Sequence, residues 1–124
     1  MIAGRVNSDL EALVELTLVN SRDGSRRTLT AVIDTGFNGF LTLHPDLLGE
    51  LNAERRGRGR AKLANGQFDV FDIFAVDVLW DGEQRTVEAD AAEAEPLIGM
   101  ELLRGFDLSS RVVPGGTMTI EGLA

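Results

Sequence analysis

The sequence of 124 residues predicts an all-β fold, and three observations support that class. Residues 12–18 alternate between an apolar face, formed by Ala12, Val14, Leu16 and Leu18, and a mixed face, which is the period of a strand with one buried side. Dipeptides typical of tight turns separate most of the other apolar segments. Helical patterns extend over only a few residues, so strands are expected to dominate.

Four hairpins are expected along the chain, each with two β-forming segments joined by a dipeptide that favours a tight turn. The pairs, with the turn of each, are 12–18 and 27–33 (Asp23-Gly24), 61–63 and 68–71 (Asn65-Gly66), 74–80 and 85–89 (Asp81-Gly82), and 109–113 and 117–121 (Gly115-Gly116). One helical turn is predicted at 45–48, because proline is tolerated at the first helical position. A short helix is predicted near 99–104, ended by Gly105 as its C-terminal cap.

Length and composition limit the class of protein. A chain of this length fits one domain with its own core, so residues 1–124 are expected to form a single domain. No apolar run approaches the roughly 18 residues of a membrane helix, and the first residues lack the pattern of a signal peptide. Cysteine is absent, which excludes disulfides and thiolate metal sites. We therefore expect a soluble, cytoplasmic protein without membrane contact.

Charge argues against nucleic acid as a partner. The net charge is −8, with 20 acidic and 12 basic residues, whereas phosphate binding depends on clustered positive charge. Five bases do cluster, and the glycines between them favour a solvated loop over a nucleic-acid contact; they are Arg55, Arg56, Arg58, Arg60 and Lys62. His44 has no second histidine or cysteine with which to form a metal site, so no metal is expected.

The chemistry is expected at Asp34-Thr35-Gly36, which directly follows the apolar segment 31–33. A carboxylate at the end of a β-forming segment needs partners, because a buried unpaired charge is costly. The glycines around it allow a tight turn with inward-facing amides, although the same tripeptide is also ordinary turn chemistry. A second motif, Leu97-Ile98-Gly99, follows downstream and opens the predicted short helix.

These motifs together resemble those of the retropepsin-like aspartic peptidases, the single-domain family that includes the retroviral proteases. The family pattern is two apolar residues and Asp-Thr/Ser-Gly, then a flap hairpin, then two apolar residues and a glycine that opens a short helix. Residues 32–36 match the first part, the hairpin at Ala61–Phe71 lies where the flap belongs, and 97–99 match the last part. The resemblance spans about residues 10–121, and the segment after Gly36 looks more like bacterial members than viral ones. It implies a small, closed, orthogonal β-barrel-like fold.

The resemblance also implies a function. Only one Asp-Thr-Gly is present, so two copies would have to pair to supply two carboxylates. The homodimer would cut extended peptides or unfolded protein, with one Asp34 activating a water and the other polarising the peptide carbonyl, without any cofactor. The implied catalytic residues are Asp34, Thr35, which would bond to its mate beneath the acids, and Gly36. The implied substrate-binding residues are Phe37, Asn38, Ala64, Asn65, Gly66 and Ile98.

Two departures from the family pattern leave an alternative open. Phe37 stands where the retroviral enzymes place a small residue, and Met100 stands where they place an arginine that braces the dimer. The alternative function is a catalytically weak or inactive dimerisation or peptide-binding module with the same fold. An open cleft above Asp34 would favour the enzyme, whereas a cleft filled by Phe37 or by a collapsed flap would favour the module. The tail 108–124 either joins a dimer sheet, as the termini do in the family, or ends as a hairpin within the chain.

Overall fold

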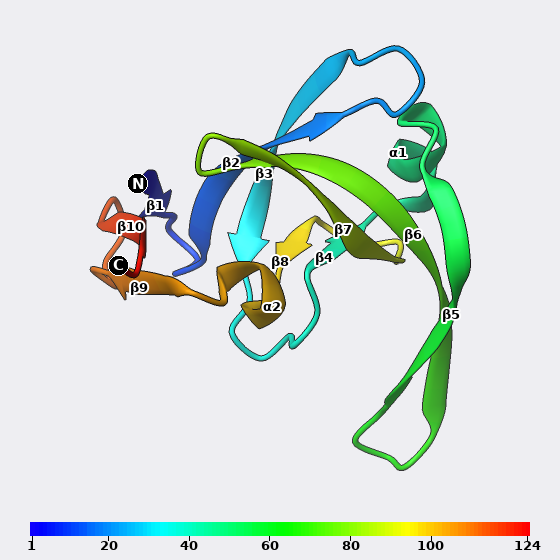
Figure 1. Cartoon of the computed structure of the whole chain (residues 1–124). Coiled ribbons are helices and arrows are strands. Elements are labelled where there is room, and N and C mark those ends of the chain that lie inside the picture. Colours follow the sequence, from blue (N-terminus) through cyan, green and yellow to red (C-terminus); the bar gives the residue numbers. More distant parts are fainter.

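The computed structural model describes residues 1–124, and strands form most of it (Figure 1). Two short helices interrupt ten strands. In chain order the elements are β1 (Ile2–Val6), β2 (Ala12–Val19), β3 (Arg26–Ile33), β4 (Leu41–Leu43), α1 (Pro45–Glu50), β5 (Glu54–Lys62), β6 (Phe68–Trp80), β7 (Glu83–Ala91), β8 (Leu97–Ile98), α2 (Met100–Leu103), β9 (Phe106–Ser110) and β10 (Thr117–Gly122). The all-β class predicted from the sequence is confirmed.

Six of the strands close into a ring around the core. The sheet order is β5-β6-β7-β4-β8-β3-β2-β1-β10-β9, and β6 also pairs with β2, so the ring comprises β6, β7, β4, β8, β3 and β2. The ring is uneven because β4 and β8 are only three and two residues long, whereas β6 has thirteen. β5 pairs with residues 68–75 of β6, and the two strands extend outward from the ring. β1, β10 and β9 continue the sheet beyond β2.

The core lies inside this ring and follows from the alternating pattern of the strands. On β2, Val14, Leu16 and Leu18 are at most 3% exposed, and they belong to a cluster of 19 buried hydrophobic residues. Trp80 at the end of β6 completes the cluster and meets the ring of Phe106 edge-on, with 6.0 Å between ring centroids. Burial of each such side chain stabilises the fold by about 1.5–3 kcal/mol, so the strand period largely determines which faces turn inward.

The predicted hairpins form, and the positive φ angles of their turn residues explain why. Gly24, Gly66 and Gly82 have φ angles of 74°, 85° and 83°, which glycine adopts without steric cost. The hairpins at 23–24, 65–66 and 81–82 therefore confirm the sequence-based prediction, and the strands of the last two extend further than the sequence indicated.

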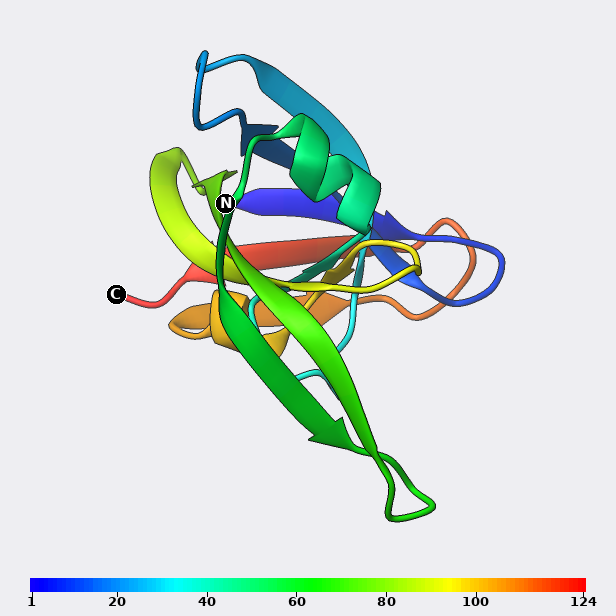
Figure 2. The same cartoon turned by 90° about the vertical axis from the view of Figure 1, so that its right-hand side faces the viewer.

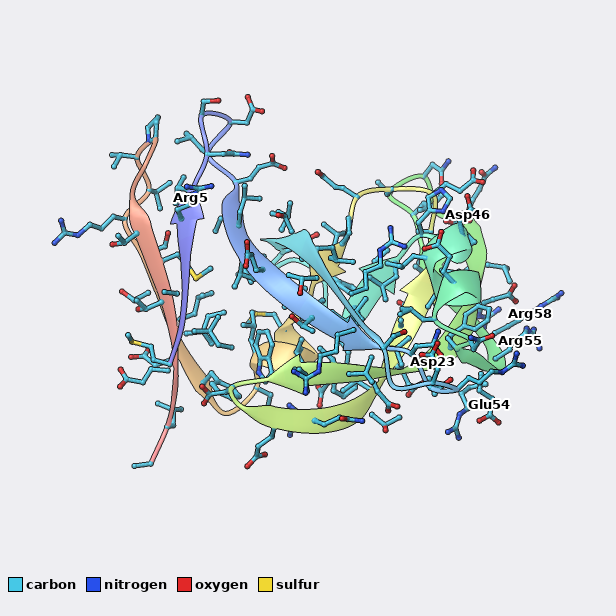
Figure 3. The ribbon with its side chains drawn as sticks, turned by 90° about the horizontal axis from the view of Figure 1, so that it is seen from above. Arg5, Asp23, Asp46, Glu54, Arg55 and Arg58 are labelled. Carbon is cyan, nitrogen blue, oxygen red and sulfur yellow. The ribbon has the colours of Figure 1, made fainter.

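The basic segment 55–62 is a strand and not the loop that the sequence analysis favoured. β5 pairs with β6 in an antiparallel register from Glu54↔Ala75 to Lys62↔Phe68. β6 supplies a long partner for backbone hydrogen bonds, and the other edge of β5 is free. The arginines of β5 are exposed, and Figure 3 shows Arg55 and Arg58 at the outer side of the molecule. Exposed charges on an edge strand also discourage pairing with other chains.

The C-terminal tail ends as a hairpin within the chain. β10 lies between β1 and β9, so both of its edges are already paired. The predicted strand 109–113 is wrong at its end, because β9 stops at Ser110 and residues 111–116 form the connecting loop. Pro114 in that loop has no N–H to donate to a sheet. β1, which the sequence analysis missed, closes this part of the sheet.

Both helices are short. α2 begins at Met100 and is followed by Gly105 with a φ angle of 87°, as the sequence predicted. α1 extends to Glu50, beyond the single turn expected, and the side chain of His44 caps it by accepting a hydrogen bond from the amide of Asp46 at 3.1 Å. Neither helix is long and apolar enough to span a membrane.

Candidate active site

Strand pairing brings the two sequence motifs together. β3 and β8 run parallel, with Val32 opposite Leu97 and Ile33 opposite Ile98. At the end of this pair the amide of Asp34 donates to the carbonyl of Ile98 at 2.9 Å. This parallel strand pair therefore fixes where the chain leaves the sheet and presents the Asp34 side chain.

The turn after β3 is tight and holds the carboxylate through the backbone. Asp34 Oδ1 accepts a hydrogen bond from the amide of Gly36 at 3.0 Å, and the amide of Phe37 donates to the carbonyl of Asp34 at 3.1 Å. Asp34 is half-buried, whereas Thr35 and Gly36 are exposed. One carboxylate oxygen is thus oriented by the chain itself, and the side chain still reaches solvent.

The first residues of α2 support the loop from the other side. The amides of Gly99, Met100 and Glu101 donate to carbonyls of residues 40, 37 and 39 at 2.9, 2.8 and 3.1 Å. The first amides of a helix have no partner within it, so these bonds satisfy them and fix the loop at the same time.

Phe37 packs against Gly39 and Gly99 and does not line the groove beside Asp34. A Cβ atom placed at Gly39 or at Gly99 would lie 2.6 Å from the Phe37 ring, so the ring rests in the space that these two glycines leave. Phe37 is half-buried there, and its neighbour Asn38 is exposed. Neither residue lines the groove beside Asp34.

The other expected substrate-binding residues divide into two groups. Ile98 is fully buried in the core and does not line the groove; its carbonyl accepts from the Asp34 amide, so it supports the Asp34 loop. Ala64, Asn65 and Gly66 are exposed at the tip of the β5–β6 hairpin, which extends well beyond the ring (Figures 1 and 2). Within one chain that tip does not line the groove beside Asp34.

An open groove of about 430 Å³ lies beside the carboxylate. Asp34 and Thr35 line it together with Leu10, Leu97 and Val112, and most of its lining is hydrophobic. Sequence reasoning did not place Leu10 or Val112 here, because they lie in loops far from Asp34 along the chain. No group of three or more histidine, aspartate or glutamate side chains is arranged to bind a metal ion.

Comparison with known proteins agrees with this architecture. No protein-family model matches the sequence, and no curated protein matches it in sequence. The structure is similar to the crystal structure of a retropepsin-like aspartic protease from Rickettsia conorii, with a TM-score of 0.60 and 17% identity over 99% of this chain and 91% of that one. The chain therefore has the retropepsin-like fold that the sequence predicted, with the uneven ring described above.

Proposed function

We propose that this chain is a homodimeric aspartic endopeptidase in which Asp34 of each copy forms the catalytic pair. The observation that carries the proposal is the Asp34 loop in a retropepsin-like fold: a half-buried carboxylate, oriented by the Gly36 amide, at the rim of an open groove. Each copy supplies one such carboxylate, and a two-fold axis beside Asp34 supplies the second. Residues 1–124 would act as one catalytic domain.

The pair performs hydrolysis by sharing a proton, because two carboxylates a few Å apart cannot both ionise easily. The ionised carboxylate takes a proton from a water as the water oxygen bonds to the peptide carbonyl carbon. The protonated partner donates to the carbonyl oxygen, which gives a tetrahedral intermediate. As the carbon–nitrogen bond breaks, the carboxyl group that took the water proton gives it to the leaving nitrogen, and a hydroxyl group of the intermediate returns a proton to the other carboxylate, which restores the pair. Neither a metal nor a cofactor takes part.

Other residues position the substrate and the pair. The Thr35 hydroxyl is exposed beside Asp34, where it can bond across the axis to the partner's loop. The β5–β6 hairpin acts as the flap over an extended peptide or an unfolded protein segment, with Ala64, Asn65 and Gly66 at its tip. Leu63, Phe68 and Val70 near that tip are 46%, 53% and 60% exposed, which provides apolar cover for a bound peptide. Backbone pairing of the peptide with the flap would resemble strand addition.

The peptide-binding module is the second candidate, and the position of Phe37 argues against it. That candidate, a catalytically weak or inactive dimerisation or peptide-binding module, would be favoured by a cleft filled by Phe37, but the Phe37 ring lies against Gly39 and Gly99 and leaves the groove beside Asp34 open. The β5–β6 hairpin also projects away from the ring of strands (Figure 1), and its tip does not line the groove beside Asp34. Met100, 44% exposed at the start of α2, is the remaining feature in favour of the module.

The test is the Asp34→Asn substitution, which replaces the proton-sharing carboxylate with an amide of nearly the same volume. Wild type and variant are incubated with an unfolded protein and a peptide library from pH 3 to pH 8, and cuts are mapped by mass spectrometry. We expect cleavage to fall by at least about 100-fold in Asp34→Asn while the dimer persists. Asp46→Asn is the matched control, because Asp46 is an exposed acid on α1 and should cut like wild type. Equal cutting by wild type and Asp34→Asn would reject Asp34 as catalyst, and no cutting by any of them would favour the module.

A further inference from the structure

Two loops lie side by side on the face that carries Asp34. They are residues 7–11, between β1 and β2, and residues 111–116, between β9 and β10, and together we call them the two-loop rim. Backbone bonds hold the second loop to Val6, the last residue of β1, from which the first loop begins: the Val6 amide donates to the Gly116 carbonyl and the Gly115 amide donates to the Val6 carbonyl, both at 2.8 Å. Figure 2 shows the two loops projecting together on one side of the molecule, with the C-terminus on the opposite side.

The rim exposes apolar side chains next to the catalytic groove. Leu10, Val112 and Val113 are 55%, 64% and 56% exposed. Leu10 and Val112 also line the groove that contains Asp34 and Thr35, so the rim and the carboxylate belong to one continuous surface. Clustered apolar side chains on a surface mark an interaction site more often than isolated ones do.

The loop that carries Leu10 is fixed in place. Asn7 Oδ1 accepts hydrogen bonds from the amides of Asp9 and Glu11 at 3.0 and 2.8 Å, and the amide of Leu10 donates to the Asn7 carbonyl at 3.1 Å. Leu10 has a φ angle of 62°, a left-handed conformation that costs a residue with a side chain about 1 kcal/mol. Within one chain this arrangement only places a leucine in water, so burial inside the monomer does not explain it.

We infer that the two-loop rim is the surface on which a second copy of this chain docks to complete the active site. The inference rests on the proposed function, because that function needs the partner's carboxylate within a few Å of Asp34. A stable interface buries about 800 Å² on each partner, which is a patch roughly 16 Å in radius. A two-fold axis beside Asp34 therefore brings the rim, which borders the same groove, into contact with the partner.

The charges of the rim suit contact with a second copy. Arg111 is exposed and takes part in no ion pair within the chain. Asp9 is also exposed on the neighbouring loop, and Glu95 lies in the groove lining. A two-fold interface brings each surface against its own copy, so a base and acids on one rim meet acids and a base on the other. An interface core of leucine and valine with charges at its edge follows the usual pattern.

The free edge of β9 is the competing contact surface. β9 pairs only with β10, so its outer edge has unpaired backbone groups that a second copy can extend. That contact would rely on main-chain bonds and not on the side chains of the rim. Substitution of a rim side chain therefore separates the two arrangements.

The experiment compares Val112→Asp with Leu123→Asp by sedimentation equilibrium over a range of concentrations. Both residues are exposed, at 64% and 67%, but Leu123 is near the C-terminus, away from the rim (Figure 2). We expect the dimer dissociation constant to rise by at least about 100-fold in Val112→Asp and to stay unchanged in Leu123→Asp. Arg111→Glu should weaken the dimer by about 10-fold, with an effect that shrinks at high salt. Circular dichroism checks that each variant is folded.

The outcomes separate this inference from the proposed function. If folded Val112→Asp dimerises as tightly as wild type, the rim is not the interface, while loss of cleavage in Asp34→Asn would still support the peptidase. If wild type dimerises through the rim but shows no cleavage, or shows cleavage that Asp34→Asn does not reduce, the rim is still the docking surface and the peptidase proposal fails. A wild type that cuts as a monomer would overturn the inference and the two-copy site together.

Discussion

At the residue scale, the fit between the Asp34 loop and α2 depends on the absence of a side chain at position 99. Gly99 has φ and ψ angles of −98° and 176°, an extended conformation open to any residue, so space and not backbone strain selects glycine. A Cβ atom there would lie 2.8 Å from the Phe37 carbonyl and still closer to the Gly39 carbonyl. Both contacts are with backbone, which cannot move without disturbing the loop that presents Asp34.

Gly99→Ala should therefore lower the free energy of unfolding by more than about 2 kcal/mol. Gly49→Ala is the matched control, because nothing lies within 4 Å of a Cβ atom at Gly49 in α1. That change should be neutral or stabilise by about 0.5–1 kcal/mol, since alanine favours helix. Urea denaturation of the two variants measures both effects. Equal stability of the two would show that the loop tolerates a side chain at 99.

Local chemistry explains which residues the sequence identified. Asp34 and the turn residues Asn65 and Gly66 stand out because their signals lie within a few neighbouring positions. Leu10 and Val112 do not stand out, because only the pairing of β1 with β10 and with β2 brings their loops to the groove. Phe37 was ambiguous for a similar reason: the space that receives its ring comes partly from Gly99, which is distant in the sequence.

At the element scale, β7 carries a carboxylate whose ionisation opposes folding. Asp90 is half-buried opposite Ile73 on β6 and Thr42 on β4. Burial, with a smaller contribution from the nearby charge of Glu88, raises the pKa of Asp90 above its ordinary value of 3.8. The folded state therefore binds more protons than the unfolded state just above pH 3.8, so this residue makes stability fall as the pH rises through that range.

Asp90→Asn should raise the melting temperature at pH 7 by about 1–3 °C, because it removes the charge that burial disfavours. The difference from wild type should shrink as the pH falls below 3.8, where Asp90 is protonated in both states. Asp69→Asn, at an exposed acid on β6 with no ion pair, controls for the change in net charge. Thermal melts at pH 7 and pH 3 test this, and a variant less stable than wild type at pH 7 would contradict it.

The elements also show where sequence patterns lose information. Two long β-forming segments joined by Asp-Gly are enough to predict a hairpin from neighbouring residues, as at 23–24 and 81–82. β4 and β8 have only three and two residues, so their pairing is decided by the strands on either side of them. β5 contains five basic residues and two glycines, a composition typical of a loop, and it is a strand only because β6 extends beside it.

At the scale of the whole molecule, the proposed site belongs to two chains, and this makes the mixing of subunits informative. When wild type and Asp34→Asn exchange partners freely, each wild-type chain meets another wild-type chain only in proportion to its share of the mixture. An equal mixture should thus retain about half of the activity per wild-type chain, and a ninefold excess of the variant about one tenth. Asp34→Asn combined with Val112→Asp should inhibit much less than Asp34→Asn alone, because a chain with a damaged two-loop rim pairs more weakly with a wild-type partner. Cleavage is measured after the mixture has been left to exchange. If the activity per wild-type chain is unchanged by added Asp34→Asn, one chain carries a complete site. If the double variant inhibits as strongly as Asp34→Asn alone, the copies meet elsewhere, at an edge such as that of β9.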